Sequence, residues 1–125
     1  MPIYALLRDA HYWLSRVSLG AALVMLAVAV VIGLVRHGDV TPWFRRTTYT
    51  IVGVMVVESL LGLALIANGG RPLDEVHLIY GAGATLALPF FIYVETTAKK
   101  RPAMGSYLWG FALLAAIVVR AMMTG

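Results

Sequence analysis

The sequence contains no cysteine among its 125 residues. Disulfide bonds, iron–sulfur clusters, thiolate ligation of haem and covalent attachment of c-type haem are therefore excluded. Charge is also scarce, because only 13% of the residues are Asp, Glu, Lys or Arg, about half the fraction usual in a soluble domain. The sequence has no nucleophile–base arrangement and no phosphate-binding loop, so it does not indicate an enzyme that acts on a soluble substrate.

Apolar sequence is what the chain has in abundance. Hydrophobic residues make up 61% of it, and the mean hydropathy is +0.85. A membrane-spanning helix needs about 20 mostly apolar residues, and four runs satisfy this, with approximate spans 12–35, 48–68, 75–95 and 104–123. Because the connections are short, neighbouring helices should be antiparallel. We predict an all-α, integral membrane four-helix bundle of up-down-up-down topology, formed by residues 1–125 as a single domain.

The basic residues predict the orientation of the bundle. Loops rich in Lys and Arg stay on the cytoplasmic side, and six such residues fall in or beside the first and third connections: Arg36, Arg45, Arg46, Lys99, Lys100 and Arg101. We therefore predict that both termini lie outside, in a bacterial inner or plasma membrane. The net charge of +4 is attributed mainly to these loops, not to nucleic-acid binding. The start of the chain lacks the features of a cleaved secretory signal.

Two histidines begin helices that should lie diagonally across the bundle. His11 precedes the first apolar run and His77 opens the third, so both should lie at a similar depth near the outer face. Imidazole nitrogens on facing helices are the ligands of a bis-histidine haem. The competing interpretation is a pair of interfacial histidines in contact with water. His37 follows the first helix and is interpreted as a solvated loop residue.

The surroundings of His77 favour a bound ligand. Asp74 is a plausible N-cap for the third helix, with Glu75 favourably placed in its first turn. Gly81 lies four residues after His77 on the same helix face and would leave room for a macrocycle, although small residues also serve helix packing in membranes. Three arginines fall on the outer side and could bind anionic propionates or simply reach the interface: Arg16, Arg71 and Arg120.

Glu58 lies near the middle of the second span, where an acid costs about 2.5–3.5 kcal/mol on insertion scales. It should therefore face the interior of the bundle or be protonated. Two interpretations stay open. Glu58 is either a proton-relay or hydrogen-bonding site beside a cofactor, or a structural hydrogen-bond partner of Ser59, Tyr49 or Thr85.

Residues 58–88, "ESLLGLALIANGGRPLDEVHLIYGAGATLAL", resemble a helix–loop–helix region of the heme A synthase family and of similar four-helix membrane cytochromes. The matching positions are Glu58, Gly62 and His77–Leu78, and the segment "DAHYWLSRVSLG" resembles that family's helix that begins with a histidine, here His11. The resemblance implies a haem held between two such histidines. The family's enzymes are two fused halves and this chain matches one half, with Glu58 in place of a glutamine. Heme A synthase activity is therefore not expected.

Two functions follow as predictions. The first is a small b-type cytochrome that binds haem b through His11 and His77. It would transfer electrons between a quinone or redox protein partner and an external acceptor, or serve as a haem subunit of a larger respiratory or photosynthetic complex. The alternative is a cofactor-free accessory subunit that packs against a larger membrane complex. A chlorophyll-type macrocycle also accepts a histidine ligand, so the identity of the macrocycle stays open.

Overall fold

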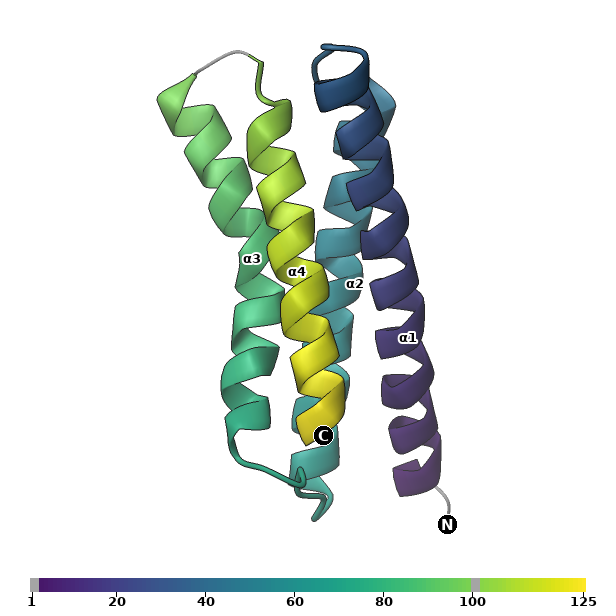
Figure 1. The fold of residues 1–125 in the computed structure, drawn as a ribbon. Coiled ribbons are helices and arrows are strands. Elements are labelled where there is room, and N and C mark those ends of the chain that lie inside the picture. The colour runs from purple at the N-terminus through teal and green to yellow at the C-terminus, as the bar shows by residue number, and fades with distance from the viewer. Residues whose placement is uncertain (1–2, 100–101) are drawn as a thin grey trace.

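The computed structural model describes residues 3–99 and 102–125, which form four long helices. Helix α1 (Ile3–Val30) continues into a short π-helix, η1 (Val31–Val35), and is followed by α2 (Pro42–Ala67), α3 (Val76–Ala98) and α4 (Met104–Thr124). The helices run side by side and alternate in direction (Figure 1). All four are long and apolar enough to cross a membrane. The predicted all-α four-helix bundle is confirmed.

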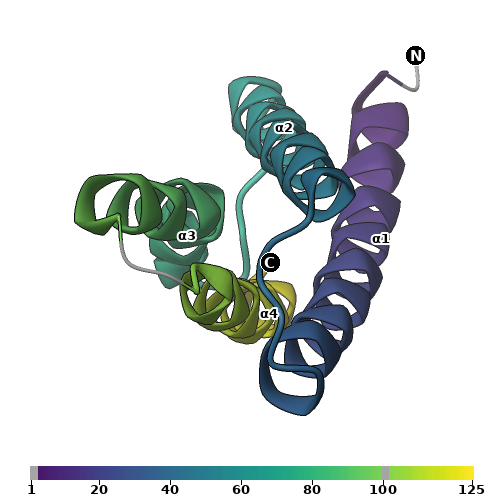
Figure 2. The ribbon, with the colours of Figure 1, turned by 90° about the horizontal axis from the view of Figure 1, so that it is seen from above.

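The order of the helices around the bundle places α1 and α3 on a diagonal. Helix α1 packs against α2 and α4, and α3 packs against the same two helices, whereas α1 and α3 do not pack against each other. Figure 2 shows this arrangement along the bundle axis. The beginnings of α1 and α3 lie at one end of the bundle, which we call the histidine end because His11 and His77 lie there.

Two helices begin earlier than the apolar runs predict. Helix α1 starts at Ile3, not near residue 12, and α2 starts at Pro42, not near residue 48. Thr41 accepts a hydrogen bond from the Phe44 N–H at 3.3 Å and Pro42 occupies the first turn, which is a favourable start for a helix. Hydropathy marks the membrane-embedded part of a helix, and here the helices extend beyond that part.

The packed core lies in the half of the bundle away from the histidine end. Within the helices, no buried residue precedes Ser18 in α1 or Ala84 in α3, and none follows Glu58 in α2. Ala22 and Ala29 are fully buried, because small residues allow close helix approach in membranes. A ring cluster fills the rest of this half, in which Phe44 meets Tyr107 and Phe111 edge to face with centroids 5.6 Å and 5.8 Å apart.

Polar side chains stabilise the end of the bundle opposite the histidines. Arg45 lies in the first turns of α2, not in the preceding loop as the sequence suggests. Its guanidinium pairs with the Glu95 carboxylate of α3 at 3.3 Å and donates to the Tyr107 hydroxyl of α4 at 3.0 Å. The Asp39 carboxylate accepts the N–H groups of Ala103 at 2.7 Å and Met104 at 3.1 Å. These contacts fasten α2, α3 and α4 together at this end.

Candidate functional site

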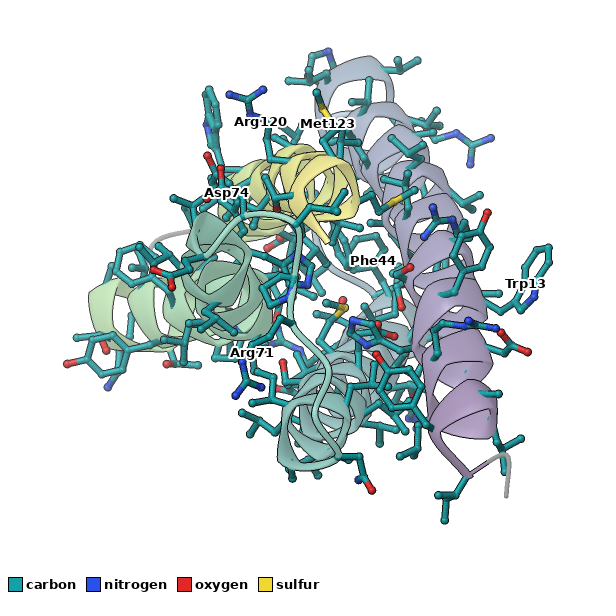
Figure 3. The ribbon with its side chains drawn as sticks, turned by 90° about the horizontal axis from the view of Figure 1, so that it is seen from below. Trp13, Phe44, Arg71, Asp74, Arg120 and Met123 are labelled. Atoms are coloured by element: carbon teal, nitrogen blue, oxygen red, sulfur yellow. The ribbon has the colours of Figure 1, made fainter. Side chains whose placement is uncertain are left out.

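A cavity of about 890 Å³ occupies the centre of the histidine end and is lined by all four helices and the α2–α3 connection. Its size is within the range of small-molecule and cofactor sites. Figure 3 views the bundle from this end. In α2 and α3 the buried core stops near Glu58 and Ala84, and the cavity occupies the part of the bundle beyond these residues.

The two predicted histidines meet across this cavity. The ring centroids of His11 on α1 and His77 on α3 are 6.2 Å apart, and their planes are almost perpendicular at 81°. The two helices do not pack against each other, so the rings span the diagonal of the bundle. The structure therefore places both residues at the same depth, as the helix starts predict.

Each histidine has its Nδ1 atom held by a neighbouring helix. His11 Nδ1 lies 2.6 Å from Glu58 Oε1 and 3.2 Å from the Glu58 carbonyl oxygen of α2. His77 Nδ1 lies 2.8 Å from the Ala121 carbonyl oxygen of α4. A carbonyl oxygen only accepts hydrogen bonds, so in each ring Nδ1 is the protonated nitrogen. In a neutral imidazole the Nε2 lone pair is then available to a ligand.

Glu58 is buried against the His11 ring, with 6% of its surface exposed. Its Oε1 atom makes a close ion-pair contact with His11 Nδ1, although neither buried carboxylate oxygen has a hydrogen bond in the part of the chain that the structure describes. The sequence suggested Ser59, Tyr49 or Thr85 as structural partners of Glu58. Ser59 and Thr85 instead hydrogen-bond to each other. Glu58 thus contacts the Nδ1 side of the His11 ring and orients it.

Two glycines border the histidines. A Cβ atom at Gly62 would lie 3.3 Å from His11 Cε1, so the absence of a side chain leaves the ring its space. A Cβ atom at Gly81 would meet no heavy atom within 4 Å, and Gly81 lines the cavity. Gly81 therefore faces open space beside His77, as predicted for a residue that provides clearance.

Three arginines, two from α1 and one from the α2–α3 connection, line the cavity. Arg8, Arg16 and Arg71 are among the lining residues. The Arg16 guanidinium stacks 3.6 Å from the centroid of the Tyr12 ring, and Arg71 donates to the carbonyl oxygen of Gly70 at 2.6 Å. Arg120 does not line the cavity. It projects from the outer side of α4, whereas Arg71 is part of the α2–α3 connection (Figure 3). The structure therefore brings only part of the predicted set of outer arginines together.

The start of α3 differs by one residue from the predicted cap. Glu75 occupies the N-cap position but makes no side-chain cap. The Asp74 carboxylate, one residue earlier, accepts the Val76 N–H at 3.1 Å. The predicted capping residue therefore supplies a hydrogen bond to the first turn, although it lies outside the cap position. The His77 side chain is oriented by α4 as well as by this turn.

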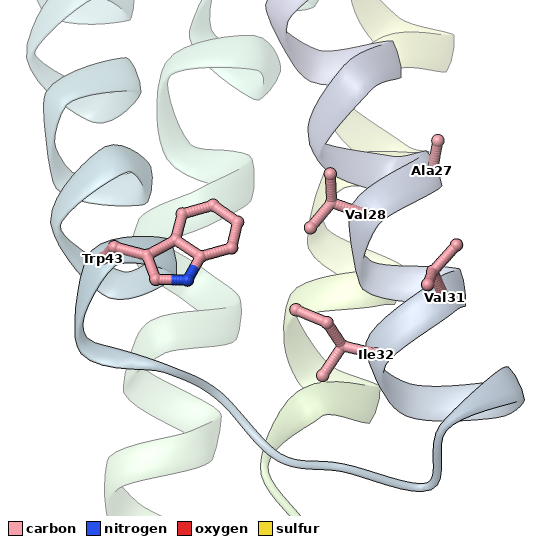
Figure 4. Close-up of a pocket in the computed structure, with 5 residues that line it drawn as sticks. All are labelled: Ala27, Val28, Val31, Ile32 and Trp43. Carbon is pink, nitrogen blue, oxygen red and sulfur yellow. The ribbon is translucent and has the colours of Figure 1, made fainter.

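A second hollow of about 350 Å³ lies on the outside of the bundle, near the start of α2. It is lined by Ala27, Val28, Val31, Ile32 and Trp43 (Figure 4). These side chains are apolar apart from the indole N–H of Trp43. The five lining residues include no titratable or metal-ligating group.

No protein-family model, no curated protein and no solved structure matches this chain. The functional argument therefore rests on the residues of the cavity.

Proposed function

We propose that the protein is a small membrane cytochrome that binds one b-type haem between His11 and His77 and takes part in electron transfer. The observation that carries this proposal is the histidine pair itself. Two imidazoles from diagonal helices lie 6.2 Å apart across a cavity, each with Nδ1 held by an acceptor. Metal-ligating histidines usually have their second nitrogen held in this way.

The spacing of the rings fits ligation of one metal ion from two sides. A metal–imidazole bond is about 2 Å long, so two rings on opposite sides of one ion have centroids about 6 Å apart. The observed separation is 6.2 Å. The separation of the rings thus matches the distance that ligation of one ion would need, and both Nε2 atoms would have to turn toward that ion.

The number of protein ligands favours a macrocycle over a bare metal ion. Among the described residues, no group of three or more His, Cys, Asp or Glu side chains is arranged to hold a metal. A structural zinc site needs four ligands, and a pair of histidines supplies two. A porphyrin supplies four ligands of its own, so its iron would need only the two further ligands that His11 and His77 would provide.

The remaining residues of the cavity have roles that suit this group. Glu58 orients His11, and the Ala121 carbonyl orients His77. Arg8, Arg16 and Arg71 line the cavity and would neutralise the propionates. When bound, the haem supplies one-electron chemistry, while the chain ligates it, orients it and neutralises its acidic edge. The partner would be a quinone or a redox protein at the outer face.

The visible spectrum of the purified protein tests this proposal. We expect a reduced-minus-oxidised spectrum with Soret and alpha bands after reconstitution with hemin. His11→Ala and His77→Ala should each abolish the low-spin bis-histidine spectrum, and His37→Ala, which lies outside the cavity, should leave it unchanged. A folded protein that stays colourless would overturn the proposal and favour a cofactor-free accessory subunit. Binding of a magnesium chlorin but not of hemin would favour a chlorophyll-type macrocycle.

A further inference from the structure

The α2–α3 side is the loosest wall of the cavity. Among the described residues, α2 and α3 pack less extensively than any other pair of neighbouring helices. A Cβ atom at Gly81 would meet nothing within 4 Å, although Gly81 lies on the same face of α3 as Thr85, which contacts α2. The two helices therefore touch near Thr85 and separate one turn further toward the histidine end.

Two exposed leucines lie where α2 and α3 separate. Leu63 of α2 is one turn from Ser59 on the same face, and Leu78 of α3 is two turns from Thr85 on the same face. Both leucines line the cavity, yet 60% of Leu63 and 50% of Leu78 are exposed. At these leucines the cavity is separated from the outside by the pair of neighbouring helices that pack least extensively. Both positions lie within helices that are apolar enough to span a membrane.

The opening has a defined boundary on each side. Toward the core, the hydroxyl groups of Ser59 and Thr85 hydrogen-bond and hold α2 to α3. Toward the end of the bundle, the α2–α3 connection crosses it, and Tyr4 packs against Gly70, where an added Cβ atom would lie 2.7 Å from the Tyr4 hydroxyl. The Tyr4–Gly70 contact joins α1 to the α2–α3 connection at the polar end of the cavity, whereas the gap between α2 and α3 is lined by leucines.

We propose that this gap is a lateral portal through which the cavity takes up its macrocycle from the lipid bilayer. The proposal rests on the proposed haem-binding function and adds the route and the physical source of the ligand. An apolar opening within the spanning helices faces hydrocarbon, so a lipid-soluble ligand can pass through it without crossing the polar end of the bundle. The hydrogen bond between Ser59 and Thr85 would hold this portal closed, because α2 and α3 cannot move apart here without breaking it. We call this hydrogen bond the latch.

A reversible cross-link tests whether the portal is used. The chain has no cysteine, so a Ser59→Cys/Thr85→Cys pair can be oxidised to lock the latch and reduced to release it. The matched control is Gly33→Cys/Met104→Cys at the opposite end, where the Cβ positions are 3.5 Å apart, a distance that suits a disulfide. In lipid vesicles preloaded with hemin, we expect oxidation to slow the growth of the Soret band by about tenfold or more in the first pair. Oxidation should change the control less than twofold.

Equal uptake rates in the oxidised and reduced Ser59→Cys/Thr85→Cys protein would overturn the portal, whereas absence of a Soret band in every form would overturn haem binding instead. A haem-independent measurement keeps the portal testable in that case. A spin label on a Gly81→Cys variant in lipid vesicles should collide more often with oxygen, which is lipid-soluble, than with a water-soluble nickel chelate. The reverse order would show that the cavity opens to water, and the portal would be wrong.

Discussion

At the scale of single residues, two residues of α2 determine where the His11 ring lies. The Glu58 carboxylate holds Nδ1 at 2.6 Å, and Gly62, one turn further along the same face, leaves the space that the ring occupies. The orientation of His11 is therefore a property of α2 as much as of α1. Glu58 and Gly62 can each be substituted while His11 itself is kept.

Enlarging Gly62 should weaken haem binding. In Gly62→Leu the new side chain begins 3.3 Å from His11 Cε1 and displaces the ring, so we expect haem affinity to fall by about tenfold or more, as for the loss of other groups that orient a metal ligand. Gly53→Leu is the matched control, because an added Cβ atom there meets nothing within 4 Å. Hemin titrations of both variants check this, and equal affinities would contradict the role of Gly62.

Two substitutions at Glu58 distinguish the effect of its side-chain oxygen on His11 from the effect of its negative charge. Glu58→Gln keeps a side-chain oxygen beside His11 Nδ1, whereas Glu58→Leu removes it and leaves only the backbone carbonyl oxygen of residue 58 as an acceptor. We expect the leucine variant to lose about 10–100-fold in haem affinity and the glutamine variant to lose less. Hemin titration and the bis-histidine spectrum provide the measurement. Wild-type affinity in Glu58→Leu would show that Glu58 does not position the ligand.

At the scale of helices, the ends of the elements are held by contacts that are distant in sequence. Asp39 follows η1, yet its carboxylate accepts backbone N–H groups at the start of α4. The end of α4 in turn supplies the carbonyl oxygen of Ala121 that holds His77. Helix α4 is thus fixed at one end by the loop after α1 and orients a candidate ligand at the other end.

Removing the Asp39 carboxylate should destabilise the protein without changing its site. We expect Asp39→Ala to lower the free energy of unfolding by about 1–2 kcal/mol, the cost of losing a helix cap. Helicity followed during unfolding in mixed micelles measures this. Asp9→Ala is the control, because Asp9 is exposed and pairs only with the neighbouring exposed Arg8 among the described residues. An equal loss in the control, or a lowered haem affinity in Asp39→Ala, would count against this account.

At the scale of the whole molecule, the two ends of the bundle differ in how densely their side chains are packed. One end has a dense core of rings and small residues, closed by the ion pair between the half-buried Arg45 and the buried Glu95. The other end has a cavity bordered by histidines and arginines. The packed half supplies the rigidity that keeps α1 and α3 in register, and the loosely packed half leaves room for a ligand.

The orientation of the bundle in the membrane remains a prediction from the basic loops. We expect the α2–α3 connection to lie outside and the loop after α1 to lie inside. A membrane-impermeant maleimide should label Leu73→Cys, which is 87% exposed, in intact cells. It should label Gly38→Cys only after the membrane is permeabilised. The opposite pattern would reverse the orientation and place the cavity at the cytoplasmic face.

The sequence by itself determined the helix number, the alternating topology and the shared depth of His11 and His77. These properties follow from the length and spacing of apolar runs, which are local quantities. The approximate spans missed the first turns of α1 and α2, because interfacial turns are polar and hydropathy does not detect them.

Only the tertiary structure decided how each helix is rotated about its axis. Helices that are apolar on nearly every side carry little sequence signal for the face that turns inward. The sequence therefore could not pair Glu58 with His11, 47 residues away, or direct Arg120 away from the cavity. It also could not show the gap between α2 and α3, because an opening results from the side chains of two helices that fail to meet.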